Sequence, residues 1–222
     1  MQKIKKAVNK NKKSENKTKP PPKKPSNALT LNEKKGILKR AIFSAIEAAF
    51  TEKTITTNQF KEEALRYIVM AKIAEVKIWG KFPNSKTISE RIVFEHKYNT
   101  SKNKNSNERY PDISSYSMFG KKITKYNLAI ELKISTGKEK GINYDKEKLK
   151  HYVAPNKGEI SYEMGALVVM PSKNKTKCLQ ELDKIKEKYN KQKLINTRKA
   201  NILICWMNTN TNKIDCFWLE VK

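Results

Sequence analysis

The chain has 222 residues, enough for one well-filled domain, and its charge is strongly unbalanced. It carries 48 lysine and arginine residues against 22 aspartate and glutamate residues, a formal net charge of +26. Such an excess is larger than solubility requires and indicates a polyanionic partner, above all a nucleic acid. The apolar runs, of which residues 166–170 are typical, are far shorter than the roughly 20 residues of a membrane-spanning helix, so no membrane partner is expected.

Several other classes of protein are excluded by what the sequence lacks. The three cysteines, Cys178, Cys205 and Cys216, form no Cys-x-x-Cys pair, and two histidines are too few for a histidine-rich metal centre. The seven glycines form no phosphate-binding loop, so no nucleotide cofactor is expected. The basic N-terminus lacks the apolar core of a secretory signal, and the cysteine usage predicts a reducing, cytoplasmic compartment.

The first 30 residues are expected to form a disordered basic arm. They contain ten lysines, one glutamate and four of the eight prolines, with almost no apolar residues to offset the entropy lost on ordering. The arm would add affinity for a nucleic-acid backbone without adding sequence specificity, or serve only as a solubilising tail. Residues 31–222 carry a net charge of +17 and are expected to form the folded domain.

The hydrophobic pattern of residues 31–222 predicts helices first and then strands alternating with helices. Helical spacing covers 32–50 and a second segment that begins at Asn58 and ends before Gly80. Further strands and helices are predicted, in chain order, as strands 91–98, 110–119 and 127–135, helix 144–153, strand 166–170, helix 175–191, and strands 201–207 and 215–221. This order predicts a single α/β domain with helices packed against one sheet.

With few histidines and no phosphate loop, any cleavage of nucleic acid would need carboxylates and a metal ion. Asp112 begins one predicted strand, and Glu131 and Lys133 lie in the next. Alternation along that strand places its residues on two faces, with Leu128, Ile130, Leu132 and Ile134 on one and Ala129, Glu131, Lys133 and Ser135 on the other. Burying a glutamate and a lysine in this way is costly unless solvent, a partner charge or a metal meets them.

The pair Pro111-Asp112, followed after eighteen residues by Glu131-Leu132-Lys133, resembles the motif of the PD-(D/E)XK nuclease superfamily. Many restriction endonucleases and recombination exonucleases share that fold. The resemblance implies a central mixed sheet flanked by helices and hydrolysis of a phosphodiester to a 5′-phosphate and a 3′-hydroxyl. It further implies that Asp112 and Glu131 hold Mg²⁺, with Mn²⁺ as a substitute, and that Lys133 lies beside the attacking water.

Members of the superfamily often have a further acid upstream of the motif. Glu95, in the preceding predicted strand, is expected to be that catalytic acid, with Glu63 and Glu75 on the second helix as alternatives. Some members also carry a Gln or Lys four residues before a Tyr on the helix that follows. Lys148 and Tyr152 resemble that pair and are candidate nucleic-acid contacts, although a packed tyrosine beside a solvated lysine explains them equally well.

The polar loop before the motif supplies three more candidate contacts to nucleic acid. Arg109, Lys102 and Lys104 are expected to touch phosphates there, or else to remain solvated. Because Glu-x-Lys also occurs at residues 33–35, 75–77, 95–97 and 220–222, the motif is informative only through its order and spacing. A surface salt bridge between Glu131 and Lys133 is the structural alternative.

The sequence therefore predicts a Mg²⁺-dependent DNA endonuclease of the restriction type. Duplex DNA is favoured over single strands, and a homodimer is compatible with the resemblance. A recombination or repair exonuclease is the variant within the same class. A non-catalytic nucleic-acid-binding protein is the alternative from a different class, and it would bind with steep salt dependence but without cleavage.

Overall fold

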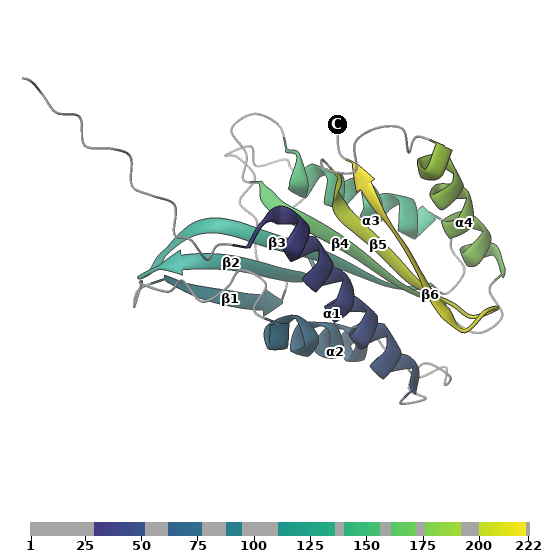
Figure 1. The fold of residues 1–222 in the computed structure, drawn as a ribbon, viewed down its shortest axis with the longest axis horizontal. Coiled ribbons are helices and arrows are strands. Elements are labelled where there is room, and N and C mark those ends of the chain that lie inside the picture. The colour runs from purple at the N-terminus through teal and green to yellow at the C-terminus, as the bar shows by residue number, and fades with distance from the viewer. Residues whose placement is uncertain are drawn as a thin grey trace, which may run out of the picture.

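The expected order of helices and strands is confirmed by a computed structural model (Figure 1). It describes residues 29–51, 62–76, 88–94, 111–135, 140–155, 161–171, 176–191 and 200–220. These residues form one six-stranded mixed sheet with four helices against it. The elements are α1 Leu31–Thr51, α2 Glu62–Val76, β1 Ile88–Phe94, β2 Ile113–Phe119, β3 Lys122–Ser135, α3 Lys140–Val153, β4 Tyr162–Pro171, α4 Thr176–Lys191, β5 Ala200–Asn208 and β6 Lys213–Glu220.

The strands lie in the sheet in the order in which they occur along the chain, from β1 to β6. β1, β2 and β3 form an antiparallel meander, whose second turn contains Gly120 at a φ of 59°, a backbone angle that glycine adopts without steric cost. β3, β4 and β5 are parallel neighbours joined through α3 and α4, and β6 returns antiparallel to β5. The mixed sheet that the sequence resemblance implies is therefore present.

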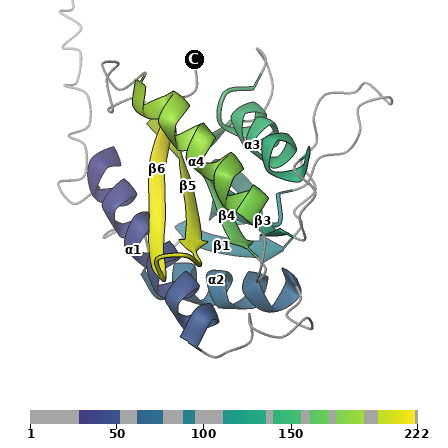
Figure 2. The same cartoon turned by 90° about the vertical axis from the view of Figure 1, so that its right-hand side faces the viewer.

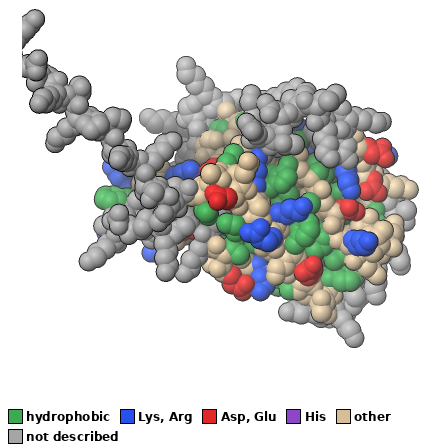
Figure 3. Space-filling model, viewed as in Figure 1, with side chains coloured by type: hydrophobic (Ala, Val, Ile, Leu, Met, Phe, Trp, Pro, Cys, Tyr) green, Lys and Arg blue, Asp and Glu red, His purple; other side chains and the backbone are tan. Residues whose placement is uncertain are grey.

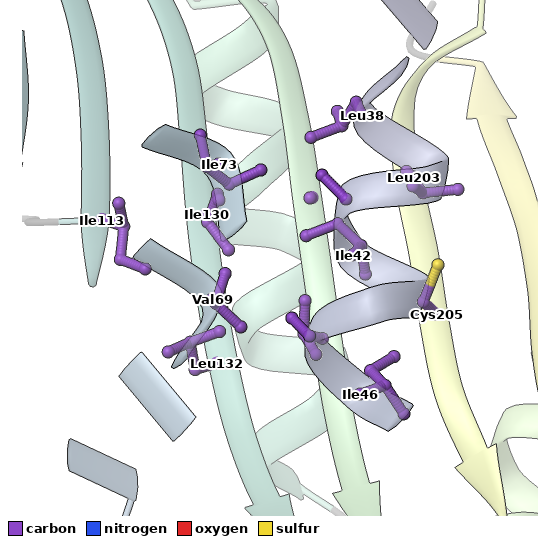
Figure 4. Close-up of a cluster of buried hydrophobic side chains, with 14 of the residues drawn as sticks. Leu38, Ile42, Ile46, Val69, Ile73, Ile113, Ile130, Leu132, Leu203 and Cys205 are labelled. Atoms are coloured by element: carbon purple, nitrogen blue, oxygen red, sulfur yellow. The ribbon is translucent and has the colours of Figure 1, made fainter. Parts of the chain in front are cut away.

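The two pairs of helices cover opposite faces of the sheet (Figure 2). Apolar side chains of α1 and α2 pack with one face of β3, β4 and β5, as the close-up in Figure 4 shows. Those of α3 and α4 pack with the other face. Leu128, Ile130 and Leu132 of β3 belong to the first cluster, whereas Ala129 belongs to the second. The alternation expected for this strand is confirmed, and it turns Glu131 toward α3.

Several element boundaries differ from the sequence expectation; β1 begins at Ile88 rather than at residue 91, and β4 at Tyr162 rather than at residue 166. β3 begins at Lys122 rather than at residue 127, because its first five residues, which are mostly polar, pair with β2 across the tight turn. α3 begins at Lys140 rather than at residue 144, and Ile142 in the added turn is buried against the sheet. A single apolar residue in a polar stretch carries too little periodicity to reveal such a turn.

Gly165 of β4 determines how closely α3 approaches the sheet. A Cβ atom there would lie 3.2 Å from Leu149 Cδ2 and from Val153 Cγ2 of α3, and 3.3 Å from Ile202 Cγ1 of β5. We expect Gly165→Ala to lower the free energy of unfolding by about 1–3 kcal/mol, because α3 must shift away from β4. Gly36→Ala, within α1 and 3.6 Å from Arg40 Nη1, is the matched control. In chemical denaturation it should raise stability by up to about 1 kcal/mol.

The surface is mixed in character where the view of Figure 3 shows it. Basic, acidic and hydrophobic side chains are interspersed on the described surface in this view, and no one type of charge dominates it. Among the described helices, none is both long and apolar enough to cross a membrane.

Candidate active site

Asp112 lies where β2 begins, directly across from the Glu131-Leu132-Lys133 segment of β3. Ile113 pairs with Ile130 in the antiparallel register, so the residue before Ile113 faces the residue after Ile130. The Asp112 carboxylate accepts a hydrogen bond from the Leu132 backbone N–H at 2.7 Å. The two halves of the motif, eighteen residues apart in sequence, therefore meet at one point of the sheet.

Glu131 is almost completely buried beneath α3, with a side chain that is 2% exposed. Its Oε2 accepts a hydrogen bond from Lys148 Nζ at 2.7 Å. Its buried Oε1 has no hydrogen-bond partner within the part of the chain that the structure describes. Burial and the nearby charge of Asp112 raise the pKa of Glu131 to about 8, and the attraction of Lys148 only partly opposes them. The positive charge of Lys148 is therefore too small to offset the effect of burial and of Asp112 on the ionisation of Glu131.

Lys133 forms the second connection between β3 and α3. Its Nζ lies 3.6 Å from Asp145 Oδ2, and the Asp145 side chain is 8% exposed. Burial raises the pKa of Asp145, while the charges of Lys133 and Lys148 lower it. On the face of β3 that α3 covers, Glu131 is thus paired with Lys148 and Lys133 with Asp145. Each charged residue of the strand has a partner of opposite charge on the helix.

Two residues of α2 that the sequence analysis missed also reach this site. Arg66 Nη2 lies 3.4 Å from Asp112 Oδ1, and both side chains are 17% exposed. Burial and the charge of Asp112 raise the pKa of Glu62, whereas Lys133 and a hydrogen bond from the Ile134 backbone lower it. Glu62 is therefore an acid close to Asp112 and Lys133.

The spacing of α2 holds a signal that Glu62 and Arg66 face the fold, although it does not show which residues they meet. Glu62 and Arg66 are separated by one helical turn and flank Leu65, which faces the core with Val69 and Ile73. Charged residues on the buried side of a helix need a partner in the fold. The alternatives Glu63 and Glu75 are exposed, and Glu75 pairs with Lys72 of its own helix at 3.1 Å.

The remaining predicted residues fall into two groups. Glu95, Lys102, Lys104 and Arg109 lie outside the described residues, so their expected roles stay predictions. Lys148 is part of the site through Glu131. Tyr152, by contrast, has no exposed surface.

Tyr152 packs edge-to-face on Tyr162, with ring centroids 6.0 Å apart, in the core between α3 and the sheet. Its expected contact with a nucleic acid is corrected on this ground, since no surface of its side chain is accessible. One turn separates Tyr152 from Lys148, so the tyrosine helps to fix the helix that presents the lysine.

Asp112, Glu131 and Asp145 each form an ion pair with a cationic side chain. No group of three or more His, Cys, Asp or Glu side chains in the described ranges has the geometry of a metal site. The chain matches no known family model and no curated protein. The charged residues that this site brings together on β2, β3 and α3 are Asp112, Glu131, Lys133, Asp145 and Lys148.

Proposed function

We propose that this protein is a metal-dependent endonuclease that hydrolyses phosphodiester bonds in DNA. The observation that supports the proposal most is the hydrogen bond from the Leu132 N–H to Asp112. It joins Asp112 to Glu131 and Lys133, the three residues that the superfamily resemblance assigns to catalysis. Glu131 is buried and its pKa is raised, a combination that is common among carboxylates in functional sites.

The residues present fit a hard divalent cation such as Mg²⁺. Glu131 Oε1 is buried without a hydrogen-bond partner among the described residues, and Asp112 adds a second carboxylate close by. Oxygen ligands from one or two carboxylates, completed by water and a phosphate, are what Mg²⁺ prefers. Asp112 and Glu131 would hold the ion, with Glu62 as a further acid at the same centre. When bound, Mg²⁺ would supply a Lewis acid that stabilises the charge developing on the phosphate.

The cationic side chains around these acids would handle the anionic substrate. Lys133 is positioned by Asp145, and its ammonium would orient the attacking water and favour loss of the water's proton. Lys148, on Glu131, and Arg66, on Asp112, hold the two carboxylates in place before metal arrives. The positive charge of these side chains would also attract the phosphate of a bound substrate.

The charge of the whole chain supports a nucleic-acid substrate. A net charge of +26 provides long-range attraction for a phosphate backbone, and such attraction weakens steeply as salt rises. Duplex DNA is the proposed substrate, since restriction-type members of the resembled superfamily act on it.

The proposal is tested by incubating the full chain with supercoiled plasmid and with long genomic DNA of mixed sequence, in Mg²⁺, Mn²⁺ or EDTA. We expect metal-dependent nicking or cutting, with no products in EDTA. Asp112→Asn should remove the activity while binding to DNA remains. Glu75→Gln is the control, because this exposed glutamate also begins a Glu-x-Lys run but lies outside the site.

Two results would contradict the proposal. Binding to DNA without cleavage of any substrate in either metal would favour a non-catalytic nucleic-acid-binding protein. Cleavage that Asp112→Asn leaves intact would place the catalytic residues elsewhere in the chain.

A further inference from the structure

Two cysteines lie directly opposite each other on the last two strands. Cys205 of β5 and Cys216 of β6 are cross-strand partners in the antiparallel register. Partners of this kind have Cα atoms about 4.5–5.5 Å apart, which is within the range that a disulfide spans. Both side chains belong to the face of the sheet covered by α1, and their thiols are hydrogen-bonded to each other. Both cysteines are free in the structure.

The environments of the two thiols differ in a way that suits different roles. Cys205 is fully buried in the apolar cluster of Figure 4, and burial raises the pKa of its thiol well above the usual value. Cys216 is partly exposed. The hydrogen bond from Cys205 and the positive charge of Lys39 on α1 lower the pKa of Cys216 to about 6, against a smaller opposing effect of burial. Lys186 of α4 adds a weaker attraction.

A cavity of about 300 Å³ lies next to this thiol pair. It is lined by Met207 and Ile214, which form the next cross-strand pair on the same face of β5 and β6. Phe43 of α1 also lines it, and the Lys39 ammonium lies 5.2 Å from the centre of the Phe43 ring. The cavity is therefore one same-face residue pair away from Cys216, whose side chain does not itself line it.

We propose that Cys205 and Cys216 form a redox-active pair that a hydroperoxide converts into a cross-strand disulfide. This site is separate from the proposed nuclease centre. It shares no residue with that centre, and it depends on α1, β5 and β6 rather than on β2, β3 and α3.

The reaction proceeds in two balanced steps. The Cys216 thiolate attacks the terminal oxygen of the peroxide, the O–O bond breaks, and the alkoxide or hydroxide that leaves takes a proton from water. Cys216 is then a sulfenic acid, oxidised by two electrons. The sulfur of Cys205 attacks the sulfur of Cys216, and the released hydroxide combines with the proton of the Cys205 thiol to form water. The buried position of Cys205 restricts it to this neighbouring partner.

The test uses the full chain with hydrogen peroxide as the probe, at neutral pH and in the absence of metal. Intact-mass analysis should show a loss of about 2 Da, and peptide mapping without reduction should locate the bond between the peptides of Cys205 and Cys216. Cys178→Ser should behave like the wild type, because the third cysteine is buried on α4. Cys205→Ser should stop at a sulfenic acid that dimedone traps.

Cys216→Ser should slow peroxide consumption at least about tenfold. The variant keeps only Cys178 and Cys205, and a thiol of ordinary or raised pKa is at most a few per cent thiolate at neutral pH. Mapping of the wild-type protein decides the outcome even if a variant fails to fold. A peroxide-treated wild type without the Cys205–Cys216 bond would overturn the proposal. So would a Cys216→Ser variant that consumes peroxide at the wild-type rate.

Discussion

Glu131→Gln is expected to make the metal-free protein more stable than the wild type at pH 8. This difference in stability should shrink as the pH falls. The pKa of Glu131 is raised from 4.5 to about 8 in the folded state. Between these two pH values the unfolded chain releases the proton and the folded protein keeps it, so wild-type stability falls as pH rises. Below pH 4.5 the ionisation of Glu131 does not affect the free energy of unfolding, because the residue is protonated in both states. Above about pH 8 it is ionised in both states, and the destabilisation has reached its full size.

The measurement is the free energy of unfolding of both proteins in EDTA, from pH 4.5 to pH 9. The stability difference should grow by up to about 1.4 kcal/mol per pH unit, the limit set by one proton, and then level off. Glu75→Gln, at a position that is 60% exposed, should show a difference that stays flat with pH. A flat difference for Glu131→Gln as well would mean that this carboxylate ionises normally in the fold.

Lys133→Met is expected to reduce metal-dependent DNA cleavage by about 10²–10⁴-fold, the usual range for a residue that assists proton transfer. The methionine keeps the length of the side chain and removes only the ammonium. Because Asp112 and Glu131 are unchanged, we expect binding of Mg²⁺ and of DNA to persist. Single-turnover cleavage rates, measured with DNA affinity on the same preparation, check this expectation.

Lys125→Met is the matched control for that variant. Lys125 lies on the same strand and is also ion-paired, with its Nζ 2.6 Å from Glu163 Oε2. Its loss removes the same charge from β3 at the other end of the strand and should leave the cleavage rate within about twofold. If Lys125→Met and Lys133→Met lowered the cleavage rate equally, the loss of activity would come from the change in net charge and not from the position of Lys133 in the site.

Much of the fold follows from local patterns in the sequence. The alternation of Leu128, Ile130 and Leu132 with polar neighbours identifies β3 and both of its faces, because a strand has a period of two whatever it packs against. The turn at Gly120 shows that β2 and β3 are neighbours, since a hairpin joins adjacent strands. The register that sets Asp112 across from Glu131 also depends on two irregularities in the pairing, between Ser115 and Tyr116 and between Ser117 and Met118, which no local pattern in the sequence reveals.

The residues that complete the site depend on contacts between distant parts of the chain. Glu62 and Arg66 reach Asp112 only because α2 packs against β3, and no local pattern fixes the angle of that packing. The partnership of Lys133 with Asp145 likewise depends on how α3 crosses over the sheet toward β4. Helix periodicity shows which side of α2 is buried, but it does not show which acid that side meets.

We propose that Asp112 and Glu131 form a metal-binding centre, a claim that can be tested without knowing any DNA recognition sequence. Isothermal titration of the full chain with Mg²⁺ at pH 7, in buffers of different ionisation enthalpy, measures both binding and proton release. With the pKa of Glu131 at about 8, binding should release close to one proton per ion, and Glu131→Gln should weaken binding and release almost none. Wild-type protein that binds no Mg²⁺, or that binds it identically after Glu131→Gln, would contradict the claim.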